Sequence, residues 1–334
     1  MCSGRRTGPM ATRRMNYADA MVDTFRICFK EDPHFTVIGN EVLGIGPTRL
    51  QFEPLQAEYP DRIYFPPTSE AAFTALAAGA AMCGHRTFAH LGVASFTYPA
   101  VSSIANEVAT IRLSSGGRIK APFIMHLNHG VVMGTSSQHS ESPQCMYWNL
   151  PGIEIALPSS GSEFKGLMRT AMNRDNPVML FTHGLLYHVE DDVPEGEYTI
   201  PFGQAAVKRK GKDATVVATS LTVGVAMQAA DILAKENIDV EVIDPRTLVP
   251  LDKKAILDSV AKTGRLVTAD ETRLNCGVGS EIAAIVAEEG FRSLKAPIVR
   301  VARAQAPVSA APTHEAYVIP TPEKTVAAVK KVMA

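Results

Sequence analysis

A carboxylate and an imidazole draw attention because each belongs to a loop in which a side chain can face a cleft. Glu70 follows the Pro-broken run Pro66-Pro67-Thr68-Ser69 and begins an Ala-rich stretch that is expected to be helical to about Cys83. His139 lies in Ser137-Gln138-His139-Ser140, in a Gly- and Ser-rich stretch that follows a strand-like segment at 122–127. A carboxylate and an imidazole on strand-end loops are the groups that proton transfer on a bound cofactor requires.

Both residues also have simpler interpretations. Ser69 is a suitable N-cap residue, and a first-turn glutamate suits the positive end of a helix, so Glu70 also fits an ordinary helix start. His139 also fits a loop histidine whose ring bonds only to nearby backbone. Composition alone leaves these alternatives open.

Three histidines, His126, His129 and His139, fall within fourteen residues and raise the question of a metal site. Apart from Glu141, no Asp, Glu or Cys accompanies them at the usual spacing of zinc ligands. The pattern therefore argues against zinc, and no metal ligand is predicted. His139 is the better proton donor of the group, because imidazole titrates near neutrality and a loop side chain can reach a cleft.

Glycine clusters indicate turns rather than a phosphate-binding loop. The run at 39–46 follows a strand-like segment, but it has no G-x-G-x-x-G that opens a helix, and Pro47 interrupts it. Gly277-Val278-Gly279 precedes a helical pattern, yet a single G-x-G is a weak signal. No Walker-type lysine occurs, so a nucleotide site has no support.

Composition is that of a soluble globular protein with room for two domains. The chain has 334 residues, of which 46% are hydrophobic and 20% charged, with a formal net charge of -1. This balance predicts neither nucleic acid nor an anionic membrane as a partner. The longest apolar runs, such as 75–83, are far shorter than the roughly 20 residues that a membrane helix needs.

Cysteine usage and the N-terminus bear on the compartment. Five cysteines are scattered without C-x-x-C spacing: Cys2, Cys28, Cys83, Cys145 and Cys276. They are typical of reduced thiols in a cytoplasmic protein. Residues 1–15 are Arg-rich and lack an apolar core, so they are not a secretory signal. We interpret them as a disordered extension, with an organellar presequence, and hence the mitochondrial matrix, as the alternative.

Short β-rich runs alternate with helix-length amphipathic runs, which predicts parallel sheets covered by helices. The predicted strands are 35–39, 87–91, 122–127, 153–157, 178–182, 214–219, 240–243, 266–269 and 298–301. The predicted helices are 17–30, 70–83, 99–113, 162–173, 223–235, 253–261, 280–289 and 322–332. The acidic segment 190–197, punctuated by Pro and Gly, is the best linker. Two α/β domains are therefore predicted on either side of about residue 200.

Several motifs in the same order give the chain a family resemblance that extends from Asn16 to the C-terminus. They are Pro60-Asp61-Arg62-Ile63, Thr68-Ser69-Glu70-Ala71, Ser115-Gly116-Gly117, Gln138-His139-Ser140-Glu141-Ser142, Pro151-Gly152-Ile153, Lys165-Gly166-Leu167, Asp175-Asn176-Pro177-Val178, Leu185-Leu186-Tyr187 and Val242-Ile243-Asp244-Pro245-Arg246-Thr247-Leu248. With them the chain resembles the beta subunits of thiamine diphosphate-dependent 2-oxo acid dehydrogenases, of the pyruvate, branched-chain and acetoin types.

The resemblance implies a fold and a set of site residues. It implies a pyrimidine-binding α/β domain at 16–200 and a transketolase C-terminal-like domain at 201–334. Glu70 matches the glutamate that bonds the aminopyrimidine ring of the cofactor, and Phe96 matches the aromatic side chain that packs on that ring. Glu41 lies one place after the position where the family usually has an acidic residue, and it is taken as a further cofactor-binding residue. His139 matches the histidine near the reacting centre, a proton donor or a guide for reductive acylation of the lipoyl group.

The chain also departs from the family pattern around the substrate pocket. Asn40 stands where an acidic residue is usual, and Ser102-Ser103 where an Asp-Gln pair is usual. The strand that commonly ends with Arg and a Gly-rich turn reads His126-Leu127-Asn128-His129-Gly130 here. Thr182 and Gly184 stand where Glu and Lys are frequent. Glu70 and His139 are kept, so cofactor activation is expected, whereas the substrate is left open.

The resemblance further implies the partners and the reaction. The expected protein is the beta subunit of an α2β2 heterotetramer that acts on a 2-oxo acid or an acetoin-like diketone and passes the acyl unit to a lipoyl-bearing acyltransferase. The pyrophosphate and Mg2+ of thiamine diphosphate are then held mainly by the alpha subunit. The alternatives are a subunit of a split transketolase-like ketol transferase, which the 276–282 and 296–301 runs argue against, and a non-catalytic assembly subunit.

Overall fold

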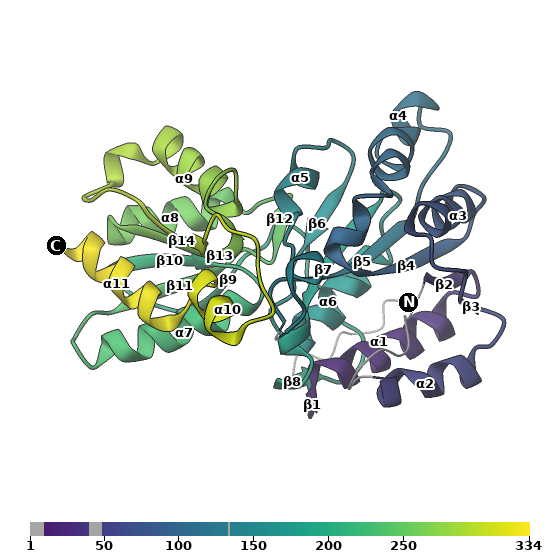
Figure 1. Cartoon of the computed structure of the whole chain (residues 1–334), viewed down its shortest axis with the longest axis horizontal. Coiled ribbons are helices and arrows are strands. Elements are labelled where there is room, and N and C mark those ends of the chain that lie inside the picture. Colours follow the sequence, from purple (N-terminus) through teal and green to yellow (C-terminus); the bar gives the residue numbers. More distant parts are fainter. Residues whose placement is uncertain (1–9, 40–48, 133) are drawn as a thin grey trace, which may run out of the picture.

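The computed structural model describes residues 10–39, 49–132 and 134–334. Two α/β units lie side by side, the first in purple to teal and the second in green to yellow (Figure 1). Each has a mainly parallel sheet with helices on its faces, so the predicted architecture is confirmed. β8 ends at Pro194 and β9 begins at Ala206, so the predicted domain boundary at residue 200 lies between these strands.

The first sheet has the strand order β12-β6-β7-β5-β4-β2-β3. Its strands are β2 (Phe35–Gly39), β3 (Ile63–Tyr64), β4 (Arg86–Val93), β5 (Phe123–His129), β6 (Glu154–Ala156), β7 (Val178–His183) and β12 (Thr247–Val249). Neighbouring strands pair in parallel except β12, which runs antiparallel to β6. Every residue of β2 and β7 is buried, as expected for parallel strands covered on both faces.

One face of this sheet is covered by α1 (Tyr17–Glu31) and α6 (Gly161–Ala171), which pack on each other. Each helix begins at a side-chain cap: Asn16 accepts from the backbone of Asp19, and Ser160 from that of Glu163. Phe25 of α1 and Phe164 of α6 are buried together with Ile124 of β5. This packing fixes which face of β5 meets the helices.

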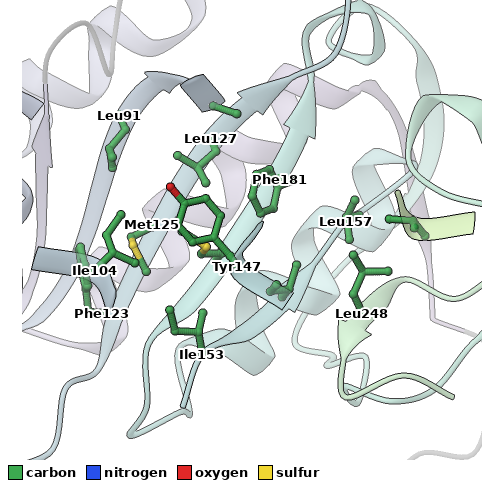
Figure 2. Packing of buried hydrophobic residues seen from close by; sticks show 14 of the residues in the cluster. Leu91, Ile104, Phe123, Met125, Leu127, Tyr147, Ile153, Leu157, Phe181 and Leu248 are labelled. Atoms are coloured by element: carbon green, nitrogen blue, oxygen red, sulfur yellow. The ribbon is translucent and has the colours of Figure 1, made fainter. Parts of the chain in front are cut away.

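The other face is covered by α3 (Glu70–Met82), by the turn η2 (Ala94–Thr97) and by α5 (Gln144–Trp148). Figure 2 shows Tyr147 of α5 among the buried side chains of this layer, near Met125 and Phe181. The same cluster continues through Leu248 of β12 into the second unit. The two units therefore share one apolar core across their contact.

The second sheet has the order β14-β13-β10-β11-β9. Its strands are β9 (Ala206–Arg209), β10 (Ala214–Ala218), β11 (Val240–Asp244), β13 (Leu266–Arg273) and β14 (Val299–Arg303). Its helices are α7 (Leu221–Ala234), α8 (Lys253–Thr263), α9 (Val278–Glu289), α10 (Pro312–Val318) and α11 (Pro322–Met333). The strands pair in parallel except β9, which runs antiparallel to β11. The remaining short elements are α2 (Arg49–Glu58), α4 (Ile111–Ser114), η3 (Ser103–Val108), η4 (Ser137–His139), η5 (Gly184–Leu186) and η6 (Phe291–Ser293).

Two sequence predictions are corrected at the edge of the first unit. Thr12–Asn16 forms β1, although residues up to 15 were expected to be disordered, and Glu190–Pro194 forms β8, although a linker was expected. The two strands pair antiparallel, with Thr12 opposite Pro194. Arg14 lies 3.1 Å from a carboxylate oxygen of Glu190, so opposite charges meet across the pair.

The helix expected at 99–113 is also divided. The chain forms a π-helical turn at Ser103–Val108, and a separate short helix follows at Ile111–Ser114.

In the part of the chain that the structure describes, no helix is long and apolar enough to cross a membrane.

Candidate active site

Three predicted site residues follow the carboxyl ends of parallel strands in one sheet. Glu70 follows β3, Phe96 follows β4 and His139 follows β5. These strands belong to the stretch β5-β4-β2-β3 of one sheet, so their carboxyl ends share one edge. Ligands of open α/β sheets bind at this edge, so the fold places the three residues where a cofactor is expected.

Glu70 is the first residue of α3 and its side chain is half-buried. Ser69 occupies the N-cap position with extended backbone, but its side chain makes no capping hydrogen bond, so the predicted cap is present in position only. Over residues 10–39, 49–132 and 134–334, the Glu70 carboxyl forms no hydrogen bond or ion pair. The carboxyl is therefore available to accept a proton or a hydrogen bond from a bound molecule.

Phe96 and His139 lie against each other. Their ring centroids are 5.4 Å apart at an interplanar angle of 72°. The neighbouring residues are also joined, because the Ser95 hydroxyl donates to the carbonyl of Gln138. Phe96 is half-buried, whereas His139 is exposed. The structure thus brings the aromatic ring and the imidazole together, and Glu70 lies on the helix that packs against the same η2 turn.

The other residues singled out in the sequence do not join this group. Glu41 and Asn40 lie outside the described residues. His126 and His129 are both buried, but His126 bonds to Thr182 on one side of the sheet and His129 bonds to Ser220 on the other. Among the described residues, no group of three His, Cys, Asp or Glu side chains is arranged to hold a metal ion.

A buried polar network, which the sequence did not predict, joins the neighbouring strands β4, β5 and β7. His90 and His126 share a hydrogen bond between their Nδ1 atoms at 2.8 Å. The Nε2 atom of His126 lies 2.9 Å from the Thr182 hydroxyl, which donates to the Asn128 side-chain oxygen at 2.8 Å. The Tyr187 hydroxyl donates to the same oxygen.

The directions of these bonds fix the tautomers of both rings. Since the Thr182 hydroxyl donates to Asn128, it accepts from Nε2–H of His126. The Nδ1 atom of a neutral His126 is then an acceptor, so His90 supplies the proton of the shared bond. Burial lowers the pKa of His90 to about 4 and that of His126 well below its usual range. The network is therefore neutral. A neutral network is compatible with a threonine at position 182, where the family frequently has a glutamate.

We expect His90→Asn to flatten the acid side of the pH–stability curve. The unfolded chain gains a proton on His90 near pH 6.5, whereas the folded chain does so only near pH 4. The free energy of unfolding is therefore not reduced by His90 above pH 6.5. As the pH falls from 6.5 toward 4, it decreases by about 3 kcal/mol because the unfolded chain takes up the proton first. Asparagine keeps a polar atom near the Nδ1 position without titrating. Denaturant unfolding near pH 7 and pH 4.5 measures the difference, and an unchanged pH dependence in the variant would contradict the neutral network.

A second buried cluster joins the two units through His183 and Glu271. His183 Nε2 lies 2.9 Å from the Glu271 carboxylate, which also accepts from the backbone of Val131 at 2.6 Å. Burial acts to raise the pKa of Glu271, but the His183 charge and hydrogen bond outweigh it and lower the pKa. Gly130 has φ +86°, and a Cβ there would lie 2.2 Å from His183 Nε2. Only glycine fits this close approach.

The residues at the edge of the sheet fit the aminopyrimidine half of thiamine diphosphate. A half-buried carboxyl without a partner among the described residues can bond a ring nitrogen, and the half-buried Phe96 ring offers an apolar surface. The exposed imidazole of His139 adjoins that ring. This donor set suits proton transfer to and from a heterocycle.

Two domains in this order define the class of transketolase-like enzymes. Residues 13–189 match the family of the transketolase pyrimidine binding domain, and residues 203–325 match that of the transketolase C-terminal domain. Among solved structures, the chain resembles a split gene transketolase described as an inactive beta4 tetramer, with a TM-score of 0.78, 22% identity, and coverage of 98% of this chain and 99% of that one. This likeness shows the fold.

Similar proteins of known name indicate which family of transketolase-like proteins the chain belongs to. The chain is 36% identical over 316 residues to the acetoin:2,6-dichlorophenolindophenol oxidoreductase subunit beta of Cupriavidus necator, covering 90% of this chain and 92% of the relative. It is 36% identical to the pyruvate dehydrogenase E1 component subunit beta of Rickettsia conorii, covering 94% and 97%. It is 34% identical to the 2-oxoisovalerate dehydrogenase subunit beta of Bacillus subtilis, covering 95% and 98%. The chain belongs to the family of thiamine diphosphate-dependent 2-oxo acid dehydrogenase beta subunits.

Proposed function

We propose that this chain is the catalytic beta subunit of a thiamine diphosphate-dependent dehydrogenase that forms an acyl unit from a 2-oxo acid or an acetoin-like diketone and transfers it to a lipoyl protein. The observation that carries the proposal is the Phe96–His139 ring pair, together with a carboxyl on α3 that has no partner among the described residues; α3 packs against the η2 turn that carries Phe96. Family membership over nearly the whole chain supports it.

Each of the three residues has a role in this proposal. The cofactor supplies, when bound, a carbon nucleophile and an electron sink. Glu70 accepts and returns a proton at a ring nitrogen of the aminopyrimidine, since its carboxyl is half-buried and has no partner among the described residues. Phe96 holds the ring by apolar contact, and His139 exchanges a proton on the substrate side, because its imidazole is exposed beside Phe96.

Partner subunits complete the proposed enzyme. We propose an alpha subunit that contributes the contacts to the pyrophosphate and Mg2+, and a lipoyl-bearing acyltransferase that accepts the acyl unit. Glu41, which lies outside the described residues, is retained as a proposed contact to the cofactor.

The purified single chain is expected to bind thiamine diphosphate poorly and to show no turnover, because the pyrophosphate and Mg2+ contacts come from the partner. Co-expression with an alpha-type subunit from the same organism restores cofactor binding and turnover of a 2-oxo acid or acetoin. Calorimetry with cofactor and Mg2+ measures binding, and a dye acceptor measures turnover. Stoichiometric binding by the single chain would contradict the division of the cofactor site. Ketol transfer between sugar phosphates by the assembly would favour the split transketolase instead.

A further inference from the structure

The loop that carries His139 is held mainly by the second domain. At one end of the loop, the backbone N–H of Gly134 donates to the Glu315 carboxylate at 2.8 Å. In its middle, the Ser137 hydroxyl donates to the carbonyl of Val308 at 2.5 Å. Both partners belong to the C-terminal part of the chain, so the position of His139 depends on the contact between the domains.

The strongest of these contacts comes from a buried arginine at the end of β14. Arg303 is only 1% exposed, and its Nη1 donates to the carbonyl of Ser140. Its Nη2 donates to the Glu141 carboxylate at 3.0 Å. One guanidinium therefore binds both residues that directly follow His139 in the chain. Planar forks of this kind fix direction as well as distance.

Glu141 is held by a second cation as well. Arg273 donates to its two carboxylate oxygens at 2.7 and 2.8 Å. Burial acts to raise the pKa of Glu141, but the bond from Arg273 and the charges of both arginines outweigh it and lower the pKa. The carbonyl of Glu141 accepts from Gly130 at 3.2 Å, which ties the loop back to the end of β5. The ionised carboxylate is thus fixed from both domains.

We propose that Arg303 is a positioning residue for His139: through Ser140 and Glu141 it fixes the loop that presents the imidazole to Phe96. On the other side of the loop, the Ser95 hydroxyl bonds the carbonyl of Gln138, so the segment is held from two directions. The inference rests on the proposed function for the role of His139. The alternative is that Arg303 only stabilises the contact between the domains.

Arg303→Met in the assembled enzyme tests the proposal. Turnover with a lipoyl domain is expected to fall about 10- to 100-fold, the scale of a misplaced catalytic group, mainly through kcat. Exchange of the thiazolium proton, which depends on Glu70, is expected to stay unchanged. Amide hydrogen exchange in the peptide that spans 134–142 is expected to become faster.

Arg300→Met is the matched control, because Arg300 lies on the same strand and is exposed, with bonds to Leu274 and Ser280. We expect no change in turnover or in loop exchange. If Arg303→Met does not fold, Glu141→Gln, which keeps both arginines, is measured in the same way. A loop with unchanged amide exchange in whichever of these variants folds overturns the proposal.

A double-mutant cycle separates positioning from stabilisation. If Arg303 acts through His139, adding Arg303→Met to His139→Ala costs little further activity, because the two changes are coupled. If the loss of activity in the double variant equals the product of the two single losses, the residues act independently. That result overturns the proposal and leaves Arg303 a structural role. If His139→Ala has no effect by itself, the proposed role of His139 fails, whereas loop exchange in the Arg303 variant still decides whether the arginine fixes the loop.

Discussion

Replacing Glu70 by Gln is expected to lower turnover of the assembled enzyme by roughly two to four orders of magnitude, the scale for a positioned acid-base group. The carboxyl lies at the first residue of α3, half-buried and without a partner among the described residues. Glutamine keeps the shape and can still accept a hydrogen bond, but it cannot take up a proton. The predicted defect is therefore chemical, and assembly is expected to be intact.

The direct measurement for Glu70→Gln is hydrogen–deuterium exchange of the thiazolium proton of the bound cofactor. An exchange rate equal to that of the parent enzyme would remove Glu70 from the mechanism. Glu323→Gln is the matched control, because Glu323 is also a first-turn glutamate, on α11. Each change removes one carboxylate from the first turn of a helix. Only the Glu70 variant is expected to lose activity.

His139→Ala is expected to leave thiazolium exchange intact and to lower turnover with a lipoyl domain by roughly two orders of magnitude or more. An imidazole on the substrate side acts after the cofactor has been activated, so the two variants fail at different stages. If His139 serves reductive acylation, activity with an artificial electron acceptor falls much less than activity with the lipoyl domain. Steady-state assays with the two acceptors make this comparison.

Other outcomes assign His139 differently. Equal losses with both acceptors would place the imidazole in decarboxylation. No loss with either would return it to a loop histidine without a chemical role. His34→Ala is the control, because His34 is also exposed but lies just before β2, at the amino end of that strand. It is expected to keep full activity with both acceptors.

Much of the fold follows from local pattern. The apolar run of β7 is long enough for a strand and too short for a helix, and such a run, buried on both faces, is what a parallel sheet requires. The site was predicted in part: Glu70 and His139 were placed on loops at strand ends, and the family resemblance added Phe96. The strand that precedes Glu70, β3, was not among the predicted strands. The contact between Phe96 and His139 agrees with that reasoning, whereas their roles stay predictions.

The remaining features depend on partners that are distant along the chain. An acidic run with Pro and Gly has the composition of a linker or of an edge strand, and only the pairing of Glu190–Pro194 with Thr12–Asn16 makes it β8. The bond between His90 and His126 spans 36 positions, and that between Arg303 and Glu141 spans 162. No local window contains both members of either pair, so periodicity and motif spacing could not predict them.

The antiparallel strand β12 has a consequence for biosynthesis. It caps the edge of the first sheet by pairing with β6, and Leu248 fills the apolar core beneath it. While the chain leaves the ribosome, β6 has no neighbour on that side until Thr247–Val249 emerges. An unpaired edge with buried apolar residues such as Ile155 can recruit a strand from another nascent chain. The edge of the first sheet is therefore complete only after a strand from the second half of the chain has been made.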